Sequence, residues 1–498
     1  MQKKLIAAAV AGLLAIPAFA QSNVTISGQL NAQYGYDGAQ GAFLNTSRFA
    51  VDAAAGVVNG NQINQNHHWR MTENSSELRF TMTEDLGGGL SAFGTIGTAF
   101  DPGYTNTVAT SGQGVIGSRN TAVGLRHKTW GEILMGRWDV HYNSHGGVDG
   151  FFAKAGLSTS SLALLQTQGT FGAGVGGRLS NVLRWASPAW NGFNLNLAVA
   201  RNSEPPFRDG NVSGTYARLD GNGGAGWAAA DVNATLGTAS AVVPGGTPNT
   251  GGAGSFVVAP NCGVLGGAAN VGSCYSYQNK NWAWQFNPTY NNGPWHLFYS
   301  YFKENNASIS RQMAMPGGGG AGSPVITDYL ITLSNVKADI TGHRAGIAYT
   351  FGMGLKVGLI WDRSRIDTDT NAAELDIFGN HRRTAWVLPV SYNTGAHTFG
   401  LTYAHAGNLR ISNCSVAMGC VDPYRPLKAA DSSTGAHYWM LGYTYDLSKR
   451  TSLSATYAKI TNESNANYDF FSNGGLGMNA AMRGADPRSI QVGMRHVF

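Results

Sequence analysis

Hydrophobic and polar residues alternate with a period of two along many short segments of this chain. In the segment 490–498, one face is formed by Ile490, Val492, Met494, His496 and Phe498. In a segment near the start of the chain, the apolar positions are Val24, Ile26, Leu30 and Tyr34. This period predicts strands, because successive side chains of a strand point to opposite faces. We expect the two segments to pair, since an unpaired strand edge leaves backbone hydrogen-bonding groups without partners.

Similar segments of about ten residues recur between these two, joined in turn by tight and by long connections. The tight connections are rich in the residues that favour turns. They lie at residues 85–89, 129–131, 187–192, 291–294, 352–354, 393–395 and 446–449. Seven hairpins and the two end strands give sixteen strands, an even number, as in closed antiparallel barrels. We therefore predict an all-β fold, a 16-stranded antiparallel transmembrane β-barrel.

The faces predicted to contact lipid carry rows of large apolar residues. Five such rows are Phe193, Leu195, Leu197 and Val199; Trp295, Leu297, Tyr299 and Tyr301; Leu355, Val357, Leu359 and Trp361; Trp386, Leu388, Val390 and Tyr392; and Trp439, Leu441, Tyr443 and Tyr445. Trp and Tyr gather at the row ends, as in the aromatic belts that meet lipid headgroups. A soluble β-sandwich also alternates. It needs an apolar second face, however, and here that face is mostly Ser, Thr, Asn, Gly and charged residues.

The long connections contain most of the low-complexity sequence. The longest, 202–279, is rich in Gly, Ala, Asn and Pro, and shorter ones run from about 304 to 340, 366 to 381, 408 to 435 and 462 to 484. Short turns at one rim and long loops at the other are typical of outer-membrane barrels. The segment 90–100 is the least regular predicted strand, because Phe93 interrupts its alternation.

The composition agrees with a polar lumen. Charged residues make up 12% of the chain, against about 25% in typical soluble domains, and the 68 glycines are about twice the usual share. The formal net charge of +6 is too small and too dispersed to predict nucleic-acid binding.

Residues 1–20 have the pattern of an export signal. Lys3 and Lys4 precede an apolar run, and Ala18 and Ala20 precede an expected cleavage after Ala20. The run is too short to cross a bilayer as a helix. Losing the two lysines changes the net charge from +6 to +4. We expect residues 21–498 to form one barrel domain that contains the 202–279 insertion.

The four cysteines form two close pairs in the sequence, Cys262 with Cys274 and Cys414 with Cys420. Four thiols allow three disulfide pairings, and export to an oxidising compartment favours the two local ones. A metal site is the alternative, but neither pair has the two-residue spacing of a zinc knuckle. We expect two disulfides within loops and no bound metal.

The connection after residues 130–137 differs from the others. A period of two places Arg137 on the outer face with Ile133 and Met135, where a charge at mid-membrane costs a few kcal/mol. The register must therefore break near Gly136. The simplest consequence is that the next segment, 138 to about 178, folds into the lumen; its polar residues include Asp139, His141, His145 and Asp149.

Five motifs carry a family resemblance: residues 83–90 (TEDLGGGL), Trp130-Gly131 before Gly136-Arg137, residues 184–193 (RWASPAWNGF), residues 445–451 (YDLSKRT) and residues 492–498 (VGMRHVF). As a set they resemble the general porins of Gram-negative outer membranes, particularly the betaproteobacterial kind. The resemblance implies a homotrimer of sixteen-stranded barrels. It also implies an inward-folded constriction loop whose acids face arginines of the wall across an eyelet.

Carried over by motif, Arg137 and Arg184 resemble two wall arginines of this eyelet, and Asp149 resembles the acid of the loop. Arg184 also falls on the lumen face by parity, because its neighbours Leu183 and Trp185 take the outside. Lys356 and Arg126 point inward by the same parity and extend a basic track.

The second strand departs from the family pattern. Where such porins read Ser-Arg-Leu-Gly-Phe-Lys-Gly, residues 76–82 read SELRFTM. Leu78 and Phe80 face outward, so Glu77 and Arg79 face the lumen and join the predicted constriction. A glutamate replaces the usual arginine, and an arginine stands two residues away, so this departure argues against a strong anion preference.

The main functional prediction is passive diffusion of small hydrophilic solutes and ions across the lipid of the outer membrane, without a cofactor. The alternative is a substrate-selective porin whose binding site includes His141 and His145; two histidines four apart can bind a metal on a helix, but Gly146 and Gly147 disfavour one. No motif supports an enzyme, since no serine lies in a Gly-x-Ser-x-Gly setting.

A further alternative is an adhesin or surface antigen, in which the 202–279 loop would bind the partner.

Overall fold

The computed structural model describes residues 23–43, 62–99, 116–141, 147–155, 159–166, 177–201, 281–316, 328–368, 380–412, 421–422, 425–429, 433–464, 466, 468–470 and 484–498. Several predictions concern segments outside these residues and stay predictions: the signal at 1–20, the 202–279 connection, His145, and the disulfides of Cys262, Cys274, Cys414 and Cys420.

Eighteen strand segments form one sheet. They are β1 (Asn23–Phe43), β2 (Gln62–Glu73), β3 (Glu77–Gly87), β4 (Leu90–Ala99), β5 (Thr121–His127), β6 (Gly131–Val140), β7 (Gly177–Ala186), β8 (Phe193–Arg201), β9 (Trp282–Asn292), β10 (Trp295–Pro316), β11 (Asp328–Thr350), β12 (Leu355–Thr368), β13 (Asn380–Thr394), β14 (His397–Ala406), β15 (Arg410–Ser412), β18 (Ala436–Asp446), β19 (Thr451–Asn462) and β20 (Asp486–Val497). A separate two-stranded sheet contains β16 (Val421–Asp422) and β17 (Arg425–Ala429).

Two pairs of segments each form a single strand of the wall. β2 and β3 pair with the two halves of β1 and are interrupted at residues 74–76, where Ser75 has a φ of 71°. β14 and β15 both pair with β13. The wall therefore contains sixteen antiparallel strands, as the sequence predicts.

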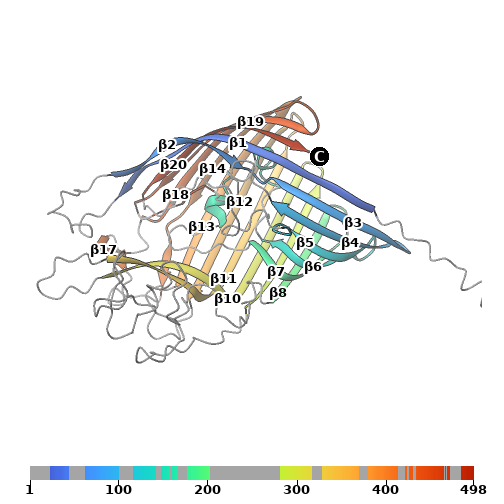
Figure 1. The fold of residues 1–498 in the computed structure, drawn as a ribbon, viewed down its shortest axis with the longest axis horizontal. Helices are drawn as coiled ribbons and strands as arrows, with labels where there is room; N and C mark the ends of the chain where they lie inside the picture. Colours follow the sequence, from blue (N-terminus) through green and yellow to red (C-terminus); the bar gives the residue numbers. More distant parts are fainter. Residues whose placement is uncertain are drawn as a thin grey trace, which may run out of the picture.

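β1 and β20 lie side by side and close the wall (Figure 1). Tyr34 lies opposite Val492 in this ladder. The backbone N–H of Phe498 donates to the Gly28 carbonyl at 3.1 Å, and the Gly28 N–H donates in return to the Phe498 carbonyl at 3.0 Å. The predicted pairing of segment 490–498 with the first strand is confirmed. Each strand of the described wall has a partner on both sides.

All seven predicted tight turns join neighbouring wall strands. β3, for example, ends at Gly87 and β4 begins at Leu90, while β13 ends at Thr394 and β14 begins at His397. The irregular segment at residues 90–100 also forms a wall strand. In this strand Phe93 faces inward, is 5% exposed, and lies under the guanidinium of Arg126, with Cζ 4.0 Å from the ring centroid.

The two faces of the wall differ as predicted. Exposed apolar residues of the outer face include Val24, Leu197, Val199, Leu359, Leu388, Leu441 and Val492. Buried polar residues of the inner face include Gln33, Thr95, Ser300, Thr402 and Gln491. Near the long-loop end, aromatic rings form a continuous row, with centroids 5.1 Å apart for Trp386 and Tyr403 and 4.3 Å apart for Tyr403 and Trp439. This row is one of the predicted aromatic belts.

Helices are few in the described residues. α3 (Phe152–Ala155) and α4 (Leu162–Gln166) both belong to the segment that follows β6. No helix in the described ranges has the length and hydrophobicity needed to cross a membrane.

Candidate pore constriction

The segment after β6 lies inside the barrel against the opposite wall. Phe151 is fully buried, and its ring fills the space where a side chain at Gly400 of β14 or Gly442 of β18 would stand. Val148 occupies the corresponding space at Gly358 of β12. Glycines at these wall positions allow the loop to pack closely, as interior contacts require. The connection therefore folds into the lumen, as predicted.

A buried charge cluster attaches the end of the loop to the wall. Asp362 accepts hydrogen bonds from Arg344 (Nε to Oδ2, 2.9 Å) and from Arg383 (Nη2 to Oδ1, 2.9 Å), and all three side chains are fully buried. Both arginines also donate to the carbonyl of Leu165, at 3.3 and 2.9 Å, and Arg383 donates to the carbonyl of Leu164. These carbonyls lie in the last turn of α4, where no intrahelical donor is available. The cluster therefore holds α4 against β11, β12 and β13.

Asp149 and Lys356 act within the same attachment. The Asp149 side chain is 2% exposed, and its Oδ1 accepts from the backbone N–H groups of Phe151 and Phe152, both at 3.1 Å. Burial raises the pKa of this carboxyl, although the two backbone donors and the charge of Lys356 act in the opposite direction. Lys356 Nζ donates to the carbonyl of Gly147 at 2.5 Å. Both residues lie in the lumen, and their polar atoms are directed at the loop.

One group of lumen charges lies on β5, β6 and β7, near the short turns. Glu132 accepts from Arg126 (Nε to Oε2, 2.7 Å) and from Arg184 (Nη1 to Oε1, 3.0 Å). Arg184 also donates to Oδ1 of Asn196 at 2.5 Å. The predicted residues Arg126 and Arg184 are therefore brought together, joined by an acid that the sequence reasoning did not select. We call these three residues the lower cluster.

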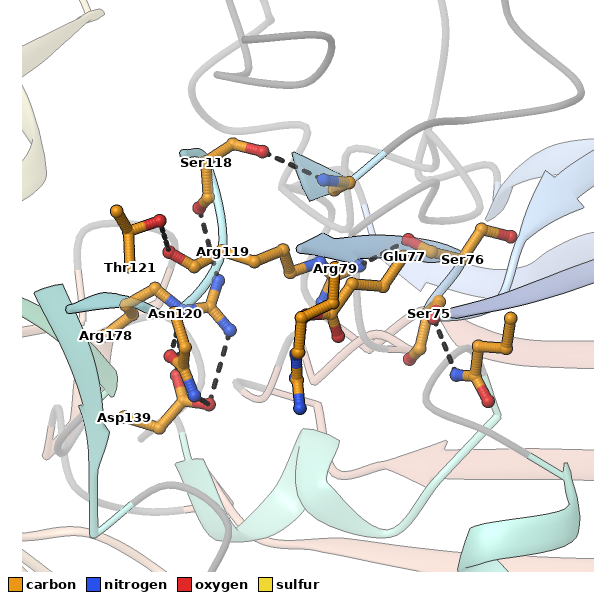
Figure 2. Close-up of polar contacts among 12 residues, drawn as sticks. Ser75, Ser76, Glu77, Arg79, Ser118, Arg119, Asn120, Thr121, Asp139 and Arg178 are labelled. Atoms are coloured by element: carbon orange, nitrogen blue, oxygen red, sulfur yellow. Dashed lines mark hydrogen bonds and ion pairs between the residues drawn. The ribbon is translucent and has the colours of Figure 1, made fainter. Parts of the chain in front are cut away.

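A second group of charges lies on β3, β6, β7 and the residues just before β5 (Figure 2). Arg79 pairs with Glu77 of the same strand, Nη2 to Oε1 at 2.7 Å. Asp139 pairs with Arg178, Nε to Oδ1 at 2.9 Å. The side chain of Arg119 runs between these two pairs in the figure, and its Nη2 donates to the Ser76 carbonyl at 3.4 Å. We call these five residues the upper cluster.

Arg137 lies on the same face of β6 as Asp139 and interacts electrostatically with the Asp139–Arg178 pair of the upper cluster. It lies opposite Thr121 in the ladder between β5 and β6, next to the pair of Val123 and Met135, which are exposed on the outer wall. Opposite residues of antiparallel strands share a face, so the register keeps Arg137 on the outer face. The predicted register break does occur, between Gly136 and Trp138 in the ladder with β7. The strand nevertheless continues to Val140 before the chain turns inward.

His141 lies at the start of the inward segment and is almost fully buried. Its Nδ1 lies 2.8 Å from the Ser300 hydroxyl, and its backbone N–H donates to Gln285 Oε1 at 2.8 Å. Burial, with the nearby charge of Arg344, lowers the pKa of this imidazole well below its usual value. The described residues contain no group of three or more histidine, cysteine or acidic residues suited to a metal ion. Through these two hydrogen bonds His141 anchors the start of the inward segment to β9 and β10.

Sequence reasoning missed several residues of the site, and a signal for them was present. Asp362 alternates with Leu359 and Trp361 on β12, and Arg383 alternates with Trp386 on β13, so parity places both charges inward. Their burial, however, depends on the loop after β6. This loop is far from them in the sequence and covers them only in the folded barrel. Arg178 lies at the end of the predicted inward segment, and Arg119 lies just before β5, where alternation is too short to assign a face.

Comparison with known proteins agrees with this architecture. A family model described as Gram-negative porin matches residues 7–323 and 320–465. An outer membrane porin protein of Bordetella pertussis is 25% identical over 206 residues, which cover 40% of this chain and 48% of that protein. The matched region thus spans about half the length of that relative.

Solved structures resemble the whole barrel. An anion-selective porin from Comamonas acidovorans has a TM-score of 0.51 and 19% identity, over 96% of this chain and 100% of that one. OmpT, an outer membrane protein of Vibrio cholerae, has a TM-score of 0.51 and 10% identity, over 96% and 98% of the two chains. At these identities the likeness establishes the fold alone.

Proposed function

Because the chain belongs to the Gram-negative porin family and to the outer membrane, we propose that it is a channel for passive diffusion of small hydrophilic solutes and ions. The observation that carries the proposal is the closed wall with a loop packed across its lumen, held at Gly400, Gly442 and the Asp362 cluster. A polar lumen that is narrowed from one side restricts solutes by size and leaves a water-filled path.

We also propose that the lower cluster, together with Glu77, Arg79 and Arg119 of the upper cluster, forms a charged constriction that faces the loop. On the other side of the lumen, Lys154 of the loop and Asp446 of the wall form an ion pair. Its Nζ to Oδ2 distance is 2.6 Å, and both side chains are about one third exposed. Opposed fixed charges in a narrow lumen with low-dielectric walls focus the electric field on passing solutes. Asp149 and Lys356 support this constriction by fixing the loop in place.

The clusters favour a modest preference for anions. Arg79 is 43% exposed and its partner Glu77 is 19% exposed, and Arg126 is 48% exposed above a Glu132 that is 20% exposed. Guanidinium groups therefore meet the pore water more than the carboxylates that pair with them. A solute near these residues experiences a positive surface, although the nearby acids reduce its potential.

The experiment is a reversal-potential measurement across planar bilayers in a salt gradient. Wild-type protein is expected to be more permeable to chloride than to potassium, and Arg184→Ala is expected to lower that ratio about twofold, because a pore charge acts directly on the permeating ion. Arg201→Ala, on the exposed outer face of β8, is the matched control and should leave the ratio unchanged. A protein without channel activity contradicts the diffusion proposal. Equal ratios in wild type and Arg184→Ala contradict only the role of the lower cluster.

We further propose a homotrimer whose subunit contact includes the outer face around Arg137. A charge next to the apolar pair of Val123 and Met135 costs less against a second protein surface than in lipid, where an arginine at mid-depth costs about 2–4 kcal/mol. Light scattering of the detergent-extracted protein gives its mass; a monomer contradicts this assembly.

A further inference from the structure

Three arginines form a row on the outer face of the barrel. Arg365 of β12 lies directly opposite Arg382 of β13, and Arg382 lies directly opposite Arg410 of β15. Opposite residues share a face, with Cβ atoms about 5 Å apart. Trp361, on the same face of β12 as Arg365, is exposed on the outer wall. The row therefore projects outward, away from the lumen.

The positive charge of this row is mostly uncompensated. Arg365 is 56% exposed and pairs with Asp367, Nε to Oδ1 at 2.7 Å. Within the described ranges, Arg382 and Arg410 form no ion pair, and neither does the exposed Arg363 two residues from Arg365. Like charges placed directly opposite on a sheet destabilise it. An anion between these side chains removes that repulsion.

The depth of the row in the membrane indicates where such an anion comes from. Trp361 lies opposite Trp386 in the ladder between β12 and β13, within the belt of aromatic rings. Aromatic belts lie at the boundary between acyl chains and headgroups. Arg365 and Arg382 lie four residues beyond these tryptophans, toward the long loops, at about 3.3 Å per residue along the strand. This distance brings the guanidinium groups into the headgroup layer.

We infer that Arg365, Arg382 and Arg410 bind the phosphate groups of anionic lipid headgroups in the leaflet on the long-loop side. The planar guanidinium group matches phosphate with two parallel hydrogen bonds and stays charged at every physiological pH. Lipid is the source of the phosphate, because the row borders the aromatic belt and faces the membrane, where headgroups are concentrated. This inference concerns the outer surface and is independent of conduction through the lumen.

The test measures lipid binding by the purified full-length protein in detergent, using native mass spectrometry. The probes are bisphosphorylated lipid A, the same lipid with its phosphates removed, and inorganic phosphate alone. The variant Arg382→Gln/Arg410→Gln is compared with Lys449→Gln/Arg450→Gln, which removes the same charge from exposed residues of the turn between β18 and β19. Single-channel conductance and the mobility of the unheated protein on gels verify that each variant is folded.

Wild type and the turn variant are expected to bind the phosphorylated lipid equally. The double arginine variant is expected to bind it about tenfold more weakly, because each basic residue near a charged surface contributes substantially to binding. Equal affinity of the two variants overturns the inference, and so does equal binding of the dephosphorylated lipid. Tight binding of inorganic phosphate alone also overturns it, since the row is then a general anion site.

Discussion

The ring of Phe151 lies directly over Gly442 of β18, and a Cβ atom at that glycine would overlap Cε1 and Cζ of the ring. The same ring covers Gly400 on the neighbouring strand β14. An aromatic side chain thus replaces the side chains that two wall positions lack. The free cross-section of the pore depends on this contact, because it sets how close the loop lies to the wall.

A larger residue at Gly442 should narrow the pore. Gly442→Leu pushes the Phe151 ring and the attached loop away from β18 toward the axis, and we expect single-channel conductance to fall by roughly half. Gly352→Leu is the control, since a Cβ there meets nothing within 4 Å. Unchanged or increased conductance in Gly442→Leu, with normal conductance in Gly352→Leu, contradicts this account of the loop contact.

Removing the acid of the lower cluster should strengthen anion preference. Glu132→Gln leaves Arg126 and Arg184 without the carboxylate that both contact, so the positive potential at the wall rises. The ratio of chloride to potassium permeability is expected to increase about twofold in reversal-potential measurements. Glu84→Gln, exposed at the end of β3, provides the comparison. A decrease in the ratio is incompatible with a lumen-facing lower cluster.

The buried Asp362 cluster should determine how firmly the loop is held. Asp362→Asn leaves two buried arginines without a countercharge, a change that costs about 3–5 kcal/mol when a buried ion pair is broken. We expect the channel to close at lower applied voltage and with more current noise. Asp367→Asn removes an exposed ion pair on the outer face, worth at most about 1 kcal/mol, and should behave as wild type. Identical closing voltages for the two variants would contradict the role of the Asp362 cluster in holding the loop.

Attachment of the loop should also depend on pH through Asp149. Burial raises the pKa of this carboxyl above the ordinary value of 3.8, so the folded loop binds the proton more readily than the unfolded chain. Its contribution to stability is present in full below that ordinary value and is lost as pH rises through the raised pKa. Acidification from pH 7 should therefore increase the closing voltage of wild type relative to Asp149→Asn, which cannot titrate. Parallel pH profiles for the two proteins would contradict this linkage.

Alternation and turn chemistry were sufficient to predict the barrel. Each strand is a local pattern, as in the rows from Leu355 to Trp361 and from Trp439 to Tyr445, and each tight turn is a few consecutive residues. Parity also placed Arg184, Arg126 and Glu77 correctly on the inner wall. These predictions succeeded because lipid on one side and water on the other leave a strand only one choice of face.

The attachments of the loop could not be derived in this way. Asp149 precedes a glycine and two phenylalanines, a sequence that suits a lumen acid and a capping residue equally, and the choice depends on what covers it. The partners of Phe151 lie on β14 and β18, hundreds of residues away. Arg137 has the motif of a wall arginine, yet its ladder position opposite Thr121 decides its face. Contacts of this kind depend on the assembled barrel, which no local pattern encodes.

The seam between β1 and β20 has a consequence for biogenesis. Gln29 and Arg495 hydrogen-bond across it although 466 positions separate them in the sequence. A polypeptide that emerges progressively into the periplasm carries two unsatisfied edges until its final strand arrives, and such edges readily recruit other chains. The unfinished protein should therefore need a holding chaperone during this interval. A prematurely terminated chain would yield a target for proteolysis instead of a smaller channel.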